Sequence, residues 1–459
     1  MSAPPASGVQ ASRSIWSLIL SRRMLACVFT GLASGLPLFL LIQTVPFWLR
    51  QEGVSLQDIG LLALAQLPYT WKFLWAPLLD RYRVARLPRR QGWIVVFQLA
   101  LAAVVAWLGF VEPVNALLTV GVCAVLIGLF SASLDIVVDA YRRELLPDAE
   151  LGLGNSIHVQ AYRISGLVAY SAALIVASQF DWTLAFTFVA GIMVLGALAA
   201  AILPGLPADR ESQRPQTLRD AFVLPFQEFL GRRGLGGVVL VLSFIVLYKL
   251  GDSMATALSS ALFVDLGFSN EEVAGVAKLT SLWAAIAGAL VGGIAMLKIG
   301  INRALWVFGA IQLLTIFGFV WLAQSPGNVW VLAIVLGAEY FGVGLGTAAF
   351  VAFMARETAP ALAATQLALF TAIAAVPRVG ATAITGFLVS GTQGASLSGF
   401  AAVLADLFVA LGLPADGLGW VGFFYLCALL AVPGMILLIW VAPWGDVESE
   451  TATAQGDQN

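Results

Sequence analysis

LLTVGVCAVLIGLFSASLDIVVDAYRR, residues 117–143, is a long apolar run that two carboxylates interrupt and two arginines end. At 1.5 Å per residue, about 20 apolar residues cross the hydrocarbon core of a bilayer as a helix. Similar runs recur along all 459 residues, of which 60% are hydrophobic and 11% charged. Only helices and closed barrels satisfy their backbone groups in lipid, and these runs are too long for barrel strands. The sequence predicts an all-α polytopic membrane protein.

We predict twelve transmembrane helices, with both termini in the cytoplasm. Lys and Arg concentrate in cytoplasmic loops of membrane proteins. With the N-terminus inside, Arg50 is the only basic residue that falls in an external segment. The predicted spans are residues 24–49, 57–79, 92–111, 115–141, 153–178, 182–203, 235–263, 270–297, 302–323, 328–354, 361–390 and 417–442.

The two halves of the chain resemble each other. AYRISG (161–166) in the fifth span aligns with AVPRVG (375–380) in the eleventh. A proline precedes each of these spans, and the two prolines are separated by nearly the same number of residues as the two motifs. Two six-helix halves with a binding site between them near midplane are typical of the major facilitator superfamily. We therefore predict an N-terminal bundle at 1–203, a cytoplasmic linker at 204–234, a C-terminal bundle at 235–445 and a disordered acidic tail at 446–459. The external segment 392–419 has no functional interpretation.

Ionisable residues recur inside the predicted spans. A charge at the centre of a membrane helix costs about 2.5–3.5 kcal/mol on the insertion scale, so a set of nearly balanced sign indicates an internal polar cavity. The slight excess of cations favours an anionic or zwitterionic solute, and hence a transporter. The set comprises Lys72, Asp135, Asp139, Arg163, Lys249, Asp252, Lys278, Glu339 and Arg378.

The carboxylates of this set are candidates for carrying a coupled proton, because enzymes and transporters place such groups in low-dielectric sites. They are Asp135, Asp139, Asp252 and Glu339. The alternative is that pairs such as Asp135 with Arg163, or Asp252 with Lys249 or Lys278, only hold helices together. The single histidine, His158, is better explained as a packing residue than as a coupling group.

Several segments resemble the bacterial AmpG family of muropeptide permeases. They are FLWAPLLDRY (73–82), LYKLGD (247–252), ATQLAL (364–369), ASGLPL (33–38), AFVA (349–352) and Tyr162-Arg163. The resemblance extends over all twelve spans. It implies a proton-driven importer in the inner membrane of Gram-negative bacteria, which carries N-acetylglucosaminyl-1,6-anhydromuramyl peptides into the cytoplasm for peptidoglycan recycling, upstream of β-lactamase induction in some species.

The resemblance also implies roles for individual residues. The intramembrane charges match polar positions of the family, and the solute, with carboxylates and an amine, needs hydrogen-bonding groups such as Gln43, Tyr69, Gln160 and Gln366. Asp80-Arg81 resembles the superfamily's gating motif, although Ala76 replaces its usual glycine. No matching carboxylate precedes Lys298 after the eighth span.

Other functions remain open at this stage. A related branch of transporters carries acetyl-coenzyme A, and charge does not separate the two solutes. A membrane enzyme needs a nucleophile or metal set, but the chain has one histidine and three dispersed cysteines. A sensor would need a signalling domain, for which the cytoplasmic segments are short. We expect no cofactor, no metal, no nucleic-acid partner, contact with membrane lipid, and a monomer.

Overall fold

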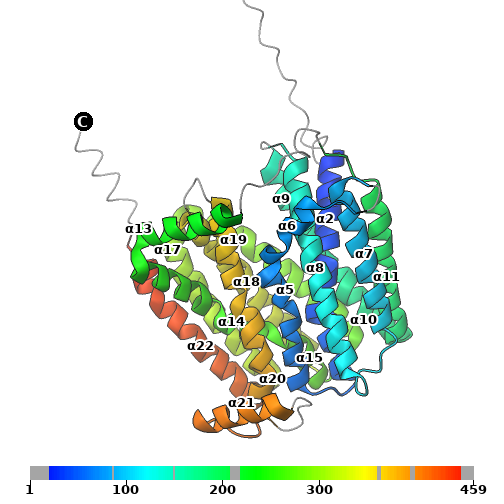
Figure 1. Cartoon of the computed structure of the whole chain (residues 1–459). Coiled ribbons are helices and arrows are strands. Elements are labelled where there is room, and N and C mark those ends of the chain that lie inside the picture. Colours follow the sequence, from blue (N-terminus) through cyan, green and yellow to red (C-terminus); the bar gives the residue numbers. More distant parts are fainter. Residues whose placement is uncertain are drawn as a thin grey trace, which may run out of the picture.

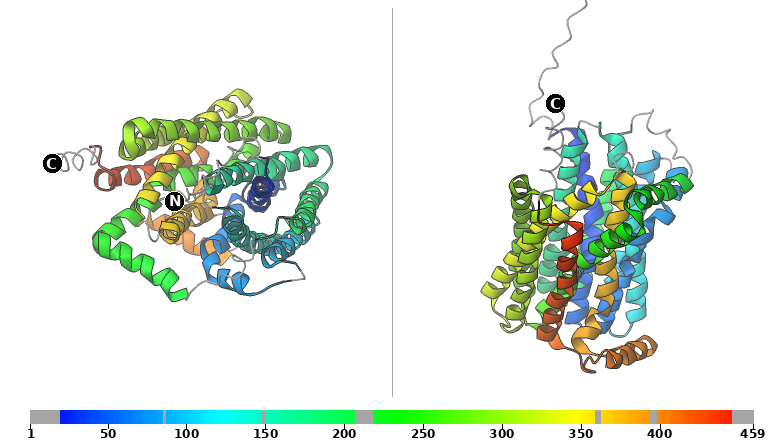
Figure 2. Two further views of the ribbon diagram at one scale, coloured as in Figure 1. Left: turned by 90° about the horizontal axis from the view of Figure 1, so that it is seen from above. Right: turned by 90° about the vertical axis from the view of Figure 1, so that its left-hand side faces the viewer.

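The computed structural model describes residues 20–84, 87–147, 150–206, 218–358, 363–392 and 398–445, and every regular element within these is a helix. The helices form one upright bundle (Figure 1). Seen from above, the first half of the chain and the second half lie side by side (Figure 2). The predicted fold class is confirmed.

The first half contains the crossings that come before residue 206. Its first crossing runs through a π-helical turn, and its fifth does the same. The elements are α2 (Arg22–Phe39), η1 (Leu40–Thr44), α3 (Val45–Gln51), α4 (Leu56–Leu61), η2 (Leu62–Gln66), α5 (Leu67–Trp71), η3 (Lys72–Leu74), α6 (Ala76–Arg81), α7 (Arg89–Leu108), α8 (Leu117–Leu145), α9 (Leu151–Gly166), η5 (Leu167–Ala172), α10 (Ala173–Gln179) and α11 (Trp182–Ala201).

The second half contains the remaining crossings. Its elements are α13 (Leu218–Tyr248), α14 (Leu250–Ala257), α15 (Ser259–Asp265), α16 (Asn270–Glu272), η6 (Val273–Ala277), α17 (Lys278–Ala323), α18 (Val329–Arg356), α19 (Ala363–Ala374), η8 (Pro377–Ala381), α20 (Thr382–Ser390), α21 (Ser398–Ala410) and α22 (Gly419–Val441). Gly300 has a φ of 73°, so α17 is two helices joined at that glycine.

The second crossing, predicted as one helix over 57–79, consists of five short helical pieces instead. Pro68 and Pro77 stand at the starts of α5 and α6. Proline lacks the backbone N–H that would continue the preceding turn, so it begins a helix more readily than it extends one. Ten helices of the described chain are long and apolar enough to cross a membrane. Adding this broken crossing and counting α17 twice gives the twelve predicted crossings.

Two helical segments lie across the ends of the bundle. The first part of α13 runs across one end and turns into the bundle at Gly234, whose φ is 66° (Figure 1). It lies in the segment predicted as the linker, of which residues 207–217 are outside the described part. Helix α21, within the external segment 392–419, lies across the opposite end (Figure 1). The predicted tail 446–459 lies outside the described residues.

Small residues let neighbouring helices approach closely in two places, near residues 31–35 and 342–346. A β-carbon on Gly31 would lie 2.3 Å from the His158 carbonyl oxygen, and one on Gly344 would lie 2.4 Å from that of Ala285. These glycines thus allow α2 to contact α9 and α18 to contact α17.

We expect Gly31→Ala to lower the free energy of unfolding by about 1–3 kcal/mol, the usual cost of overpacking a close contact. The midpoint of thermal unfolding in detergent measures this. Gly121→Ala is the matched control, because a β-carbon on Gly121 meets no atom within 4 Å. Equal midpoints for the two variants would contradict the proposed α2–α9 packing.

Candidate functional site

A polar cavity of about 220 Å³ lies between the two halves. The first half contributes residues from α2, η1, α9 and η5, and the second half contributes residues from α15, α17 and α18. The polar and aromatic lining residues are Phe39, Gln43, Arg163, Tyr170, Ser259, Ser260, Phe263, Lys278, Ser281 and Tyr340. We refer to this space as the central cavity.

The central cavity contains two cations and no carboxylate in its lining. Lys278 is 8% exposed, and its Nζ donates to Gln43 Oε1 over 2.7 Å. The same ammonium lies 4.5 Å from the centre of the Phe39 ring and 5.9 Å from that of Tyr170. Within the described residues, neither Lys278 nor Arg163 forms an ion pair. A buried site with two uncompensated positive charges favours an anion.

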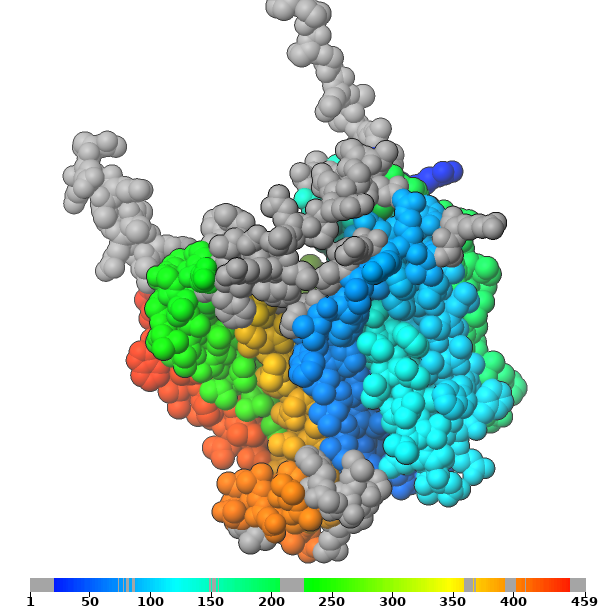
Figure 3. All heavy atoms as spheres, in the orientation of Figure 1, coloured from blue at the N-terminus to red at the C-terminus, as the bar shows by residue number. Residues whose placement is uncertain are grey.

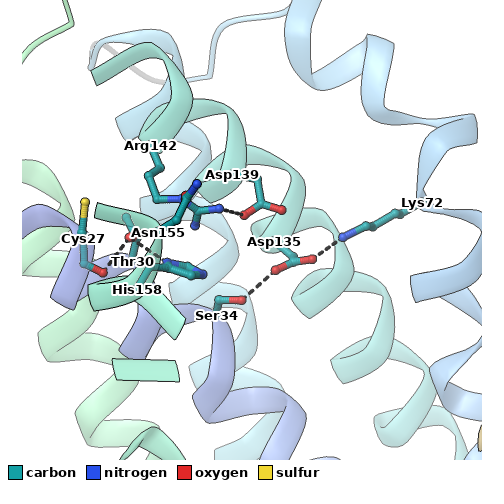
Figure 4. Close-up of polar contacts among 9 residues, drawn as sticks. All are labelled: Cys27, Thr30, Ser34, Lys72, Asp135, Asp139, Arg142, Asn155 and His158. Atoms are coloured by element: carbon teal, nitrogen blue, oxygen red, sulfur yellow. Dashed lines mark hydrogen bonds and ion pairs between the residues drawn. The ribbon is translucent and has the colours of Figure 1, made fainter. Parts of the chain in front are cut away.

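Asp135 of α8 forms an ion pair with Lys72 of the broken second crossing (Figure 4). Its other carboxylate oxygen accepts a hydrogen bond of 2.7 Å from Ser34 Oγ on α2. The interpretation that Asp135 pairs with Arg163 is therefore wrong. Arg163 lines the central cavity instead, because α9 continues past Asp135 toward the half interface.

Asp139 lies one turn further along α8 than Asp135, and His158 projects from α9 (Figure 4). Asp139 Oδ1 accepts from Arg142 over 2.9 Å, and Arg142 also donates to Asn155 of α9 over 2.9 Å. His158 Nδ1 lies 3.1 Å from Thr30 Oγ1 on α2. These contacts join α2, α8 and α9, which is the packing role expected for His158.

In the second half, Lys249 donates to Asp252 Oδ2 over 3.0 Å, as their spacing predicts. Lys278 does not share this carboxylate, because it bonds to Gln43 across the half interface. Glu339 of α18 faces Asp252 and is 1% exposed. Neither oxygen of Glu339 has a hydrogen-bond partner among the described residues, and the same holds for Asp252 Oδ1.

Arg378 lies in η8, beside Tyr69 and Tyr162 of the first half. Its Nε is buried and has no hydrogen-bond partner within the described chain. Tyr69 itself bonds to Ser131 of α8. Tyr69 and Arg378 therefore lie at the half interface, but neither is in the lining of the central cavity.

The remaining predicted site residues lie elsewhere. Gln366 donates to Glu228 Oε2 over 2.6 Å, so it ties α19 to the surface part of α13. Gln160 is an exposed residue of α9. Asp80 and Arg81 end α6, and their side chains lie outside the described part of the structure, so the gating prediction stands untested.

The structure adds aromatic and hydroxyl residues to the predicted site: Phe39, Tyr170, Ser259, Ser260 and Tyr340. Two sequence signals could have indicated some of them. Ser259 and Ser260 form a polar pair inside the seventh predicted span, and Tyr340 follows the intramembrane Glu339 directly. Single tyrosines and phenylalanines in apolar helices give no such signal, because they occur equally in the core.

A second, larger cavity of about 1030 Å³ lies between the broken second crossing and α8. Figure 3 shows these two segments next to each other on the surface of the bundle. Apart from Asp58, its lining is apolar and includes Leu64, Trp71 and Val122, which are exposed. This face contacts lipid chains in a membrane, so we assign solute binding to the central cavity.

The halves are joined at the end that the basic residues place outside. Arg50 at the end of the first crossing pairs with Asp265 at the end of α15, and Asp265 also accepts from Trp420 Nε1 over 2.9 Å. Gln51 donates to Asn270 over 2.6 Å, and Gln57 donates to the Gly391 carbonyl over 2.9 Å. We call the Arg50–Asp265–Trp420 contact the outer latch. These contacts hold the two halves together at that end.

We expect Asp265→Ala to open the outer end more often. Losing the acceptor of Arg50 and Trp420 costs the closed state about 1–2 kcal/mol, which raises the open fraction about five- to thirtyfold. A Ser260→Cys reporter in the central cavity, labelled from outside by a membrane-impermeant thiol reagent, measures this. The native cysteines are buried.

Asp406→Ala is the control for this prediction, because Asp406 is an exposed carboxylate of α21 at the same end of the molecule. It should leave the labelling rate unchanged. If Asp265→Ala labels no faster than Asp406→Ala, the outer latch does not hold the closed state.

The described residues contain no group of three or more His, Cys, Asp or Glu side chains able to hold a metal ion. The three cysteines are buried and unpaired, as their positions inside spans predict. The chemistry of the site is therefore that of charges, hydroxyls and aromatic rings around a cavity.

Comparisons with known proteins agree with this architecture. The sequence pattern of the Major Facilitator Superfamily matches residues 27–382. An uncharacterized protein of Haemophilus influenzae is 43% identical over 96% of this chain and 100% of its own length. The anhydromuropeptide permease of Escherichia coli K12 is 35% identical over 89% of this chain and 77% of its own length.

Solved structures support the fold alone. A D-xylose–proton symporter superposes with a TM-score of 0.65 at 14% identity, covering 92% of this chain and 98% of that protein. A transporter of the POT family superposes with a TM-score of 0.62 at 11% identity, covering 95% of this chain and 99% of that protein.

Proposed function

Because this chain belongs to the major facilitator superfamily of transporters and is related to anhydromuropeptide permeases, we propose that it imports anhydromuropeptides together with protons. The solute would be N-acetylglucosaminyl-1,6-anhydromuramyl peptides, moved from periplasm to cytoplasm across the inner membrane. The imported fragments would re-enter peptidoglycan synthesis and, in some species, act upstream of β-lactamase induction. The protein is not an enzyme.

The charge of the central cavity is the observation that carries this proposal. Arg163 and Lys278 face the same space from opposite halves, and its lining holds no carboxylate. A peptide fragment with free carboxylates supplies the missing negative charge, so its binding would pull the two halves together. Hydroxyl groups of Ser259, Ser260 and Tyr340 offer donors and acceptors of the kind that sugar and peptide groups need.

The aromatic residues of the central cavity support the same solute. Phe39, Tyr170 and Tyr340 present ring faces next to the cations, and apolar sugar faces and peptide side chains pack on such rings. At about 220 Å³ the closed central cavity holds one charged part of a muropeptide. The remainder of the solute would extend along the interface between the halves when the structure opens.

Uptake of labelled anhydromuropeptide into proteoliposomes tests the proposal. With an inward proton gradient we expect accumulation above the equilibrium level, and without one only equilibration. Unlabelled disaccharide–peptide fragments should compete, whereas acetyl-coenzyme A should not. Competition by acetyl-coenzyme A alone would instead support the alternative solute. Absence of muropeptide uptake by well-folded protein would overturn the proposal.

A further inference from the structure

Two buried carboxylates that are short of hydrogen-bond donors lie beside the central cavity. Glu339 is 1% exposed and both of its carboxylate oxygens lack a hydrogen-bond partner. Asp252 faces it from α14, with Oδ2 bonded to Lys249 and Oδ1 buried without a partner. Three carboxylate oxygens that need a donor therefore meet in one buried place.

Among the described residues, Lys249 is the cation that acts on this pair. Thr315 of α17, Tyr340 of α18 and Cys427 of α22 lie near Glu339, and Tyr248 lies near Asp252, but all four are uncharged. Two further cations on elements that contact α14, Arg378 and Lys278, have other neighbours. Arg378 of η8 lies beside Tyr69 and Tyr162, and Lys278 of α17 bonds to Gln43.

Two carboxylates and one ammonium leave one uncompensated negative charge in a site of low dielectric. A proton shared by the two carboxylates removes this charge and the repulsion between them. A proton between Asp252 and Glu339 also supplies the donor that their free oxygens lack. We propose that Asp252 and Glu339 together bind the proton that drives transport, an inference that rests on the proposed function.

The same helices connect this pair to the solute. Glu339 is followed in α18 by Tyr340, which lines the central cavity, and Asp252 precedes the cavity residues Ser259 and Ser260 by two turns of α14 and α15. Losing the proton restores the repulsion between α14 and α18. Helix α14 leads directly into α15, and α15 and α18 both line the central cavity, so the packing of the second half around the cavity depends on whether the proton is bound.

Gradient-driven uptake in Glu339→Gln tests the pair. The amide keeps the shape of a protonated carboxyl group but does not release a proton. A pH difference of about one unit drives about tenfold accumulation for each coupled proton. We expect Glu339→Gln to reduce the accumulation ratio to about one while counterflow exchange of solute continues, and Asp252→Asn to do the same. Glu112→Gln, in an external loop, is the control and should behave as the wild type.

A second readout separates this inference from the choice of solute. Infrared spectroscopy of the purified protein should show the C=O stretch of a buried protonated carboxylic acid, which Glu339→Gln removes or shifts and Glu112→Gln does not. If that band is present but muropeptide uptake is absent, the proton site stands and the proposed solute is wrong. If uptake occurs and Glu339→Gln still accumulates solute against its gradient, the proton site is wrong.

Discussion

Lys278→Gln is expected to raise the solute concentration for half-maximal uptake about 30- to 150-fold. Hydrogen bonds to charged groups are worth up to about 3 kcal/mol, and a loss of about 2–3 kcal/mol corresponds to this range. The effect should be large because Lys278 is 8% exposed, so water does not replace the lost charge. Arg163→Gln should act in the same direction, since it removes the other cation of the central cavity.

The control for this prediction is Lys298→Gln, which removes an exposed lysine further along α17. Uptake kinetics in proteoliposomes, normalised to the amount of folded protein, should be the same for this variant and the wild type. A half-saturation concentration that does not change in Lys278→Gln would show that the central cavity does not bind the anionic part of the solute.

Lys72→Met is expected to lower the free energy of unfolding by about 2–3 kcal/mol. Removing one partner of a fully buried ion pair costs about 3–5 kcal/mol, because the remaining charge loses its compensation. We expect the smaller loss of about 2–3 kcal/mol for this pair, because the side chains of Lys72 and Asp135 are 31% and 20% exposed. The double variant with Asp135→Asn should recover much of the loss, since no unpaired charge then remains.

A double-mutant cycle on thermal unfolding in detergent measures the coupling between Lys72 and Asp135. The reference cycle uses Arg23→Gln and Glu150→Gln, whose ion pair of 3.2 Å should contribute about 1 kcal/mol or less, because the Arg23 side chain is 45% exposed. Uptake by the Lys72–Asp135 double variant then separates two roles. If the double variant is stable but does not transport, the Lys72–Asp135 pair also has to rearrange during transport. If the double variant transports fully, the pair has only a structural role. A coupling energy equal to that of the reference cycle would contradict the prediction.

The sequence predicts the crossings well because each depends on a local property. Twenty apolar residues must form a helix in lipid wherever they occur, and the Lys249–Asp252 pair follows from adjacent turns of one helix. The breaks at Pro68 and Pro77 were also readable in principle, since both prolines lie inside a predicted span. A prediction from hydropathy misses these breaks, because hydropathy does not depend on whether a residue has a backbone N–H group.

Contacts between distant parts of the chain were predicted less well. Judged by depth in the membrane alone, both Lys72 and Arg163 could pair with Asp135. Depth therefore does not decide which of the two forms the ion pair. Helix rotation makes that choice, and it is set by close packing such as that of Gly31 against α9. The outer latch was not predicted, because Arg50 and Asp265 lie 215 residues apart in the sequence and no local pattern connects them.

The most direct test of the cationic central cavity is a binding cycle that changes the protein and the ligand together. Affinity for anhydromuropeptide and for a derivative with its carboxylates converted to amides would be measured by calorimetry, on the wild type and on Lys278→Gln. We predict that amidation weakens binding to the wild type strongly and to Lys278→Gln much less, because the two changes remove the same interaction. An equal loss on amidation in both proteins would contradict the assignment of Lys278 to the solute's negative charge.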